Sequence, residues 1–160
     1  MSTREARQRL AEAQAALAQA LAQGAAVPPG FDAERVHETA RALLSKRRRW
    51  VERSWPRLAA ALGEGFRARF ETWARVHPME LEASPLADGR RFAEPLLSTG
   101  EFPEEARDEL LAFEVRHRLN EAGLVVARRG LVLKSQRMGR ARLLAARLPG
   151  GRVLRLRLPF

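Results

Sequence analysis

The side chains that most often carry chemistry in proteins are sparse in this sequence. Histidine occurs three times, at His37, His77 and His117, and cysteine does not occur. The histidines lie forty residues apart, so none lies within one helical turn of another, as metal-binding histidines commonly do. Without cysteine there is no thiolate nucleophile, disulfide or thiolate metal site. We therefore expect no metal site and no bound cofactor.

Motifs that mark common enzyme classes are also missing. The sequence has no Gly-x-Ser-x-Gly pattern, which would mark a nucleophile elbow. Gly63–Gly65 does not match a phosphate-binding or dinucleotide-binding loop, and no strand is predicted before it. The acids Glu104, Glu105, Asp108 and Glu109 are interpreted as the exposed first turn of a helix, whose dipole they match. The sequence favours a binding protein over an enzyme.

The positive charge of the chain is concentrated at its C-terminal end. The net charge is +10, but residues 115–160 contain twelve lysines and arginines and a single acid, Glu121. This segment therefore carries +11, and residues 1–114 carry −1. Such asymmetry predicts an anionic partner for the C-terminal segment: a nucleic acid, an acidic protein surface or an acidic peptide.

A helical segment rich in aromatic residues precedes this basic region. Residues 42–78 contain all three tryptophans, and their apolar residues recur at intervals of three, four or seven. Pro56 has no amide hydrogen and fits a first helical turn, so we expect two helices to meet at a corner at Trp55 and Pro56. A third helix follows Gly63–Gly65. An ordinary helical core explains this pattern without any functional meaning.

Helix-capping residues predict two helices in the N-terminal part of the chain. Ser2 and Glu5 form a predicted capping box, and Gly24 is a natural helix stop. Asp32 caps the next helix, which leads into the tryptophan-rich segment. Its basic run, Lys46–Arg49, is interpreted as a solvated helix face, with a contact surface as the alternative.

The chain after the tryptophans is predicted to be helical with interruptions. Residues 79–87 are expected to be irregular because Pro85 is excluded from a helix interior. Asp88 then caps a short helix that runs to Leu97 and is interrupted or kinked at Pro95. A further helix is predicted over residues 103–123, from Pro103 to Gly123.

Beyond Gly123 the hydrophobic period changes from helical to two. Residues 124–126 and 131–133 are short β-like runs, and residues 142–148 and 152–158 flank Pro149–Gly151, a strong hairpin signal. A two-glycine turn pairs Leu148 with Val153. This register predicts one face made of Leu143, Ala145, Leu154, Leu156 and Leu158, and an opposite face made of Arg142, Arg155 and Arg157.

These patterns predict an α+β protein. We expect a mainly α-helical body of about five to six helices over residues 1–122, and a small basic antiparallel sheet over residues 123–160. No run approaches the roughly 18 apolar residues of a membrane-spanning helix. The chain is therefore expected to be soluble and cytoplasmic.

The central segment also carries a pattern known from a protein family. Its elements are an aromatic-Pro corner, a Leu-x-x-x-x-Gly run, spaced aromatics before His-Pro, a Pro-Leu-Ala-Asp run and a later Leu-x-x-x-Glu. In this sequence they are Trp55-Pro56, Leu58 to Gly63, Phe66, Phe70, Trp73, His77-Pro78, Pro85-Leu86-Ala87-Asp88, Phe92, and Leu110 with Glu114. Over residues 30–118 this resembles the HvfC/MbnC-like partner proteins, and it is similar to the C-terminal domain fused to some actinobacterial members of the associated enzyme family. The family's Tyr-Arg-Asn-Asn-like run is replaced here by Ser45–Arg49.

The resemblance implies that the chain is an accessory subunit and not itself a catalyst. Members of this family form a heterodimer with a TIM-barrel multinuclear iron oxygenase. That enzyme modifies a ribosomally made precursor peptide, and the partner protein helps to hold the leader of the precursor. The expected partners are therefore the oxygenase and a leader peptide.

The basic sheet offers a place for such a leader. The edge of a small sheet can accept an extended peptide strand, and an arginine face would select acidic side chains. The predicted peptide-binding residues are Arg142, Arg155 and Arg157, with Leu144 and Val153. Arg47, Arg48 and Trp50 are predicted to contact the oxygenase. Alternatively, the arginines only solubilise an exposed sheet face.

Nucleic-acid binding is the main competing hypothesis. The +11 segment supports it, as does the run Lys46–Arg49 if both lie on one surface. The C-terminal segment, however, has neither tyrosine nor tryptophan, so it provides little for base stacking.

Overall fold

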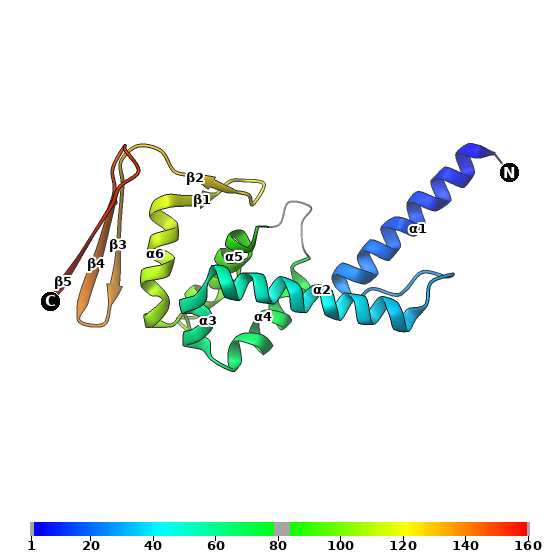
Figure 1. The fold of residues 1–160 in the computed structure, drawn as a ribbon, viewed down its shortest axis with the longest axis horizontal. Coiled ribbons are helices and arrows are strands. Elements are labelled where there is room, and N and C mark those ends of the chain that lie inside the picture. The colour runs from blue at the N-terminus through cyan, green and yellow to red at the C-terminus, as the bar shows by residue number, and fades with distance from the viewer. Residues whose placement is uncertain (1, 79–83, 160) are drawn as a thin grey trace. The chain divides into compact units, whose positions relative to one another are not determined.

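The computed structural model describes residues 2–78 and 84–159, and within these ranges it contains six α-helices followed by two small antiparallel sheets (Figure 1). The helices are α1 (Thr3–Gln23), α2 (Ala33–Ser54), α3 (Pro56–Leu62), α4 (Gly65–Val76), α5 (Pro85–Ser98) and α6 (Arg107–Arg116), with a 3₁₀ turn at Glu104–Ala106. The strands are β1 (His117–Leu119), β2 (Val125–Ala127), β3 (Val132–Met138), β4 (Ala141–Arg147) and β5 (Val153–Pro159). The predicted α+β class is confirmed. No helix in the described ranges has the length and apolar character needed to cross a membrane.

The chain folds as two compact units. The first unit takes its described residues from Met1–Trp50 and Arg67–Leu81, and the second from Val51–Phe66 and Glu82–Phe160. The first unit therefore contains α1 and most of α2 and α4. The second contains α3, α5, α6 and both sheets. The boundary at residue 122 that the composition suggested stays a prediction.

Helix caps in the first unit follow the sequence. The Ser2 hydroxyl accepts a hydrogen bond from the Arg4 amide (3.3 Å), and the Glu5 carboxylate accepts one from the Ser2 amide (3.1 Å). Asp32 accepts hydrogen bonds from the amides of Glu34 and Arg35 (3.0 and 3.2 Å). The capping box and the Asp32 cap are therefore confirmed, because short side chains at these positions satisfy amides that a helix leaves unpaired.

The predicted corner at Trp55 and Pro56 is also confirmed. α2 ends at Ser54 and α3 begins at Pro56, whose missing amide hydrogen costs nothing in a first turn. The Trp55 side chain is buried in the second unit. Its Nε1–H donates to the Leu86 carbonyl oxygen (3.2 Å), and its ring centroid lies 5.4 Å from that of Phe113. This tryptophan therefore ties α3 to α5 and α6.

Helix α5 begins earlier than predicted. It starts at Pro85, which occupies a first-turn position, and the Ser84 hydroxyl caps it by accepting from the Leu86 amide (3.3 Å). Asp88 is not the cap but a buried residue inside the helix. Pro95 is inside the helix, as expected. Residues 79–83 of the segment predicted to be irregular lie outside the described residues.

Helix α6 ends at Arg116 rather than at Gly123. His117–Leu119 leaves the helix and pairs with Val125–Ala127 as strands β1 and β2. Gly123 lies in the turn between them with φ of 73°, a left-handed conformation that glycine adopts without a steric penalty. The strand pairing overrides the helical pattern that His117 continues.

The second sheet has the strand order β3-β4-β5, and its register differs from the prediction. Arg147 pairs with Val153 and Ala145 with Arg155. The predicted partners, Leu148 with Val153, are wrong because the hairpin loop has three residues rather than two. The Gly151 amide donates to the Leu148 carbonyl oxygen (2.8 Å), and Gly151 itself has φ of 84°. A shift of one residue moves every β5 side chain to the opposite face.

Candidate functional site: the outer face and open edge of the C-terminal sheet

The face of the three-stranded sheet that packs on α6 is its inner face. Leu143 and Ala145 of β4 form a buried cluster with Leu111 and Val115 of α6, and Met138 and Val153 pack against this cluster. Val153, which we predicted to bind peptide, is thus half-buried and contributes to holding the sheet on the helix.

The outer face of the sheet is apolar and exposed. The register places Leu133, Ala146 and Leu154 side by side across it, followed by Leu144 and Leu156. Leu133, Leu154, Leu156 and Leu158 are 69%, 54%, 56% and 41% exposed. The leucines were predicted to share a face with Leu143 and Ala145, and this is wrong. We call Leu133, Leu144, Leu154, Leu156 and Leu158 the leucine face. Leu144, one of the predicted peptide-binding residues, belongs to it.

The predicted arginine face does not exist as one surface. Arg155 and Arg157 point to the inner side of β5, opposite Ala145 and Leu143, whereas Arg142 lies on the outer face opposite Leu158. The one-residue shift in register is the cause. A peptide could therefore not contact all three arginines from one side.

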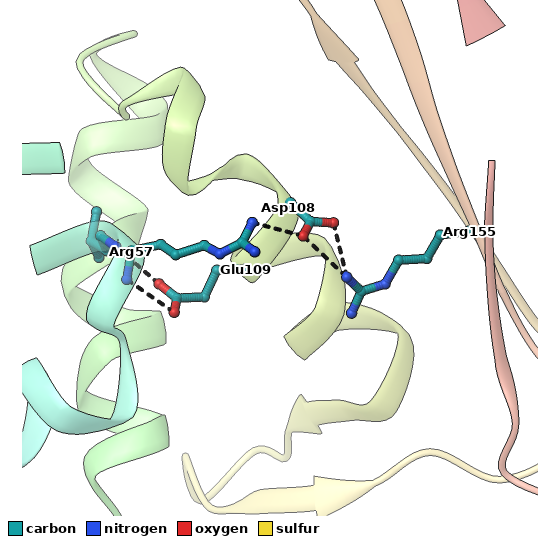
Figure 2. Close-up of polar contacts among 5 residues, drawn as sticks. Arg57, Asp108, Glu109 and Arg155 are labelled. Carbon is teal, nitrogen blue, oxygen red and sulfur yellow. Dashed lines mark hydrogen bonds and ion pairs between the residues drawn. The ribbon is translucent and has the colours of Figure 1, made fainter. Parts of the chain in front are cut away.

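Arg155 holds β5 to α6. Its guanidinium Nη1 donates to both carboxylate oxygens of Asp108 (3.0 and 3.1 Å), and Arg57 of α3 donates to the same carboxylate (2.9 Å), as Figure 2 shows. The Asp108 side chain is 21% exposed, so it is partly shielded from solvent. Asp108 thus bridges a helix and a strand, a structural role that its position among four acids did not reveal.

The neighbouring residue, Glu109 of α6, caps the N-terminus of α3. Its carboxylate accepts hydrogen bonds from the backbone amides of Arg57 and Leu58 (3.2 and 2.9 Å; Figure 2). The residue at the N-cap position of α3 is Trp55, which makes no side-chain capping bond. The interpretation of Asp108 and Glu109 as merely exposed first-turn acids is therefore wrong for both.

Strand β5 has an open edge. It pairs with β4 on one side, and no strand of the described chain pairs with its other side. Its residues from Leu154 to Pro159 are all exposed. Such an edge presents unpaired backbone donors and acceptors to solvent and can accept another strand.

Two hollows in the second unit are lined in part by arginines. Arg137 and Arg142 lie directly opposite each other on β3 and β4, and with Gly139 and Arg140 they line an open hollow of about 350 Å³. A second hollow of about 800 Å³ lies along β2 and is lined in part by Arg118, Arg128 and Arg129, as well as by Leu131 and Val132. Guanidinium groups arranged in this way suit carboxylates or phosphates.

The residues predicted to contact the oxygenase lie in the first unit, and two of them are structural. Arg47 is 6% exposed and donates to the carbonyl oxygens of His77 and Ala74 (2.7 and 3.4 Å). The Arg48 side chain is 16% exposed and pairs with Glu71 (3.7 Å). The interpretation of this run as a solvated face is thus wrong for both residues, because the C-terminal half of α4 covers them. Trp50 remains accessible at 40% exposure.

The histidines do not assemble into a site. The described residues contain no group of three or more His, Cys, Asp or Glu side chains that could hold a metal ion. Burial and the nearby charges of Arg116 and Arg147 lower the pKa of His117 from its usual value. His77 stacks on Trp73, with ring centroids 4.7 Å apart.

Comparison with known proteins places the chain in a family. It is 45% identical over 116 residues to a UPF0276 protein of Streptomyces avermitilis, a match that covers 72% of this chain but 22% of that protein. The chain thus spans about a fifth of the length of this relative. No solved structure shows a significant match. The family model described as "SCO6045-like, C-terminal domain" matches residues 11–98, more than half of the chain, so the chain belongs to the SCO6045-like C-terminal domain family.

Proposed function

We propose that this chain is a non-catalytic partner subunit in the biosynthesis of ribosomally made, modified peptides. In this role it forms a heterodimer with a multinuclear iron TIM-barrel oxygenase and binds the leader of the precursor peptide. The observation that carries the proposal is the open, basic edge of β5, which is exposed from Leu154 to Pro159 and bordered by arginines. This is a surface to which an extended peptide can add as a further strand.

Strand addition and charge have separate roles in this proposal. Exposed ion pairs typically contribute less than about 1 kcal/mol each, so arginines alone do not give firm binding. Backbone pairing along the edge supplies affinity. The +11 charge of residues 115–160 raises the association rate and selects acidic sequences.

The Streptomyces relative supports a partnership with a larger protein. It joins a segment similar to this chain to a remainder that makes up most of its length. Linking two modules in one polypeptide gives each a high effective concentration near the other, which favours modules that work together. We infer that this chain acts together with a protein that corresponds to the remainder of the relative, and we propose that this protein is the oxygenase. Trp50 is the candidate contact residue that is accessible.

Nucleic-acid binding is the second candidate function, and the arginine-lined hollow along β2 favours it. The outer face of the sheet argues against it, because it presents leucines where single-strand-binding surfaces present aromatic rings. Residues 123–159 contain no aromatic residue.

Affinity purification of the full tagged chain from the cells that produce it tests the proposal. We expect one protein to co-purify in stoichiometric amount, and elemental analysis to find iron in the complex at several times the level of the untagged control. The Trp50→Ala variant should recover less of it, whereas Leu10→Ala, a change at an exposed residue of α1, should recover as much. Recovery of the chain without iron, together with a steep fall of its affinity for generic DNA as salt increases, would support the nucleic-acid alternative instead.

A further inference from the structure

We propose that the open edge of β5 selects a peptide strand in which apolar and acidic residues alternate. Apolar side chains of the strand extend the leucine face, and its acidic side chains meet Arg157. This inference rests on the proposed function and specifies the sequence pattern that the leader must carry.

The backbone of β5 determines which groups a new strand can reach. The Leu148 amide donates to the Arg152 carbonyl oxygen (2.8 Å), which identifies this pair as hydrogen-bonded. Hydrogen-bonded and non-hydrogen-bonded pairs alternate along an antiparallel ladder. Like Arg152, Leu154 and Leu156 therefore direct their backbone N–H and C=O groups toward β4. The backbone groups of Arg155 and Arg157 are then directed to the open edge. Pro159 has no amide hydrogen and ends the run of available donors.

The two faces of β5 give an added strand two environments. A residue placed beside Leu156 would lie on the outer face, among exposed leucines that gain from being covered. The residues before and after it would point to the inner side, where β5 presents Arg155 and Arg157. Because successive side chains of a strand point to opposite faces, this surface matches a period of two.

The two inner arginines are not equivalent. Arg155 already donates twice to Asp108, so its guanidinium is engaged in a contact within the chain. Arg157 is exposed and lies two residues further along β5, on the same side of the strand. An acidic residue of the peptide is therefore expected beside Arg157 rather than beside Arg155.

Charge also argues against a second copy of this chain as the occupant. Antiparallel pairing of two β5 strands would bring arginines from both copies together on the same side of the sheet. Like charges directly opposite each other destabilise a strand pair, whereas opposite charges stabilise it. The edge thus discourages self-association and favours an acidic strand.

The test uses three synthetic peptides of equal length and with equal numbers of valine and glutamate residues. In the first the two residues alternate, in the second they form two blocks, and the third is the alternating peptide with every second amide methylated. Binding to the full chain is measured by titration calorimetry or NMR. We expect the alternating peptide to bind about tenfold more tightly than the block peptide, which corresponds to about 1.4 kcal/mol. Methylation of the amides that face β5 should abolish binding.

Matched variants locate the binding site. Arg157→Glu should weaken binding of the alternating peptide about tenfold. Arg129→Glu changes the net charge equally but lies outside β5, so it should have little effect. Leu154→Thr combined with Leu156→Thr should also weaken binding, whereas Leu10→Thr, at a similarly exposed leucine of α1, should not.

The outcomes separate this inference from the proposed function. Equal affinity for the alternating and block peptides would overturn the pattern while leaving charge-driven binding of an acidic leader intact. Loss of binding with Arg129→Glu but not Arg157→Glu would move the site to the hollow along β2. If no peptide binds although the iron protein still co-purifies, the edge of β5 is not the recognition surface.

Discussion

The Gly89→Ala variant is expected to be markedly less stable than the parent chain. Gly89 lies inside α5, where alanine normally stabilises a helix by up to about 1 kcal/mol over glycine. A Cβ at this position would overlap the indole ring of Trp55, which is 1% exposed. Overpacking of this kind typically destabilises by about 1–3 kcal/mol. The clash therefore outweighs the gain in helix propensity.

Urea denaturation, monitored by circular dichroism, measures the difference in unfolding free energy between the variant and the parent chain. A loss of 1–3 kcal/mol corresponds to a fall of several degrees in melting temperature for a chain of this size. Gly150→Ala is the matched control, because a Cβ there would meet nothing within 4 Å and should leave stability nearly unchanged. A Gly89→Ala variant more stable than the parent would show that Trp55 does not pack against α5 as described.

The Arg47→Met variant is expected to lose about 2–4 kcal/mol of stability. Arg47 is buried, and its guanidinium donates to carbonyl oxygens of Ala74 and His77 at the C-terminal end of α4. The last carbonyl groups of a helix have no partner within the helix, and leaving a buried acceptor unpaired costs about 1–3 kcal/mol. The guanidinium also lies 5.3 Å from the centre of the Trp73 ring, a cation–π contact that methionine cannot make.

The neighbouring Arg49→Met variant provides the control for Arg47. Arg49 is exposed on the same helix, so its replacement removes the same charge and should change stability by less than about 0.5 kcal/mol. Thermal unfolding of both variants distinguishes a structural arginine from a surface one. Equal effects of the two substitutions would mean that Arg47 has no special role in the first unit.

Local signals in the sequence predicted much of the fold. The capping residues at Ser2 and Asp32 and the corner at Trp55 and Pro56 depend on interactions within a few residues. They could be predicted because the residue types themselves satisfy or lack particular backbone hydrogen bonds. The change from a helical to a two-residue hydrophobic period likewise predicted the C-terminal sheet.

The features that could not be predicted depend on contacts far apart in the sequence. Arg47 is buried because α4, which begins eighteen residues later at Gly65, covers it. Glu109 caps a helix that lies fifty-one residues earlier in the chain. The acid cluster after Pro103 gave no sign of either Asp108 or Glu109 reaching another element.

The faces of β5 illustrate how a single residue in a loop can reverse a functional interpretation. Pro149–Gly151 indicated a hairpin, but it did not show whether two or three residues form its loop. Three residues place Arg155 and Arg157 on the side of Leu143, and the leucines on the outside. The outer face, which was predicted to carry arginines, therefore carries leucines, and Arg155 and Arg157 lie on the inner side. The proposed peptide accordingly changes from an acidic strand to one in which apolar and acidic residues alternate.

The most direct test of the account is amide hydrogen exchange at β5, measured by NMR with and without the alternating valine–glutamate peptide. We predict that the amides of Arg155 and Arg157, which face the open edge, exchange fast in the free chain and become protected when the peptide is added. The amides of Leu154 and Leu156, already paired with β4, should be protected in both states. Unchanged exchange at Arg155 and Arg157, with new protection along β2 or in the first unit, would contradict the account.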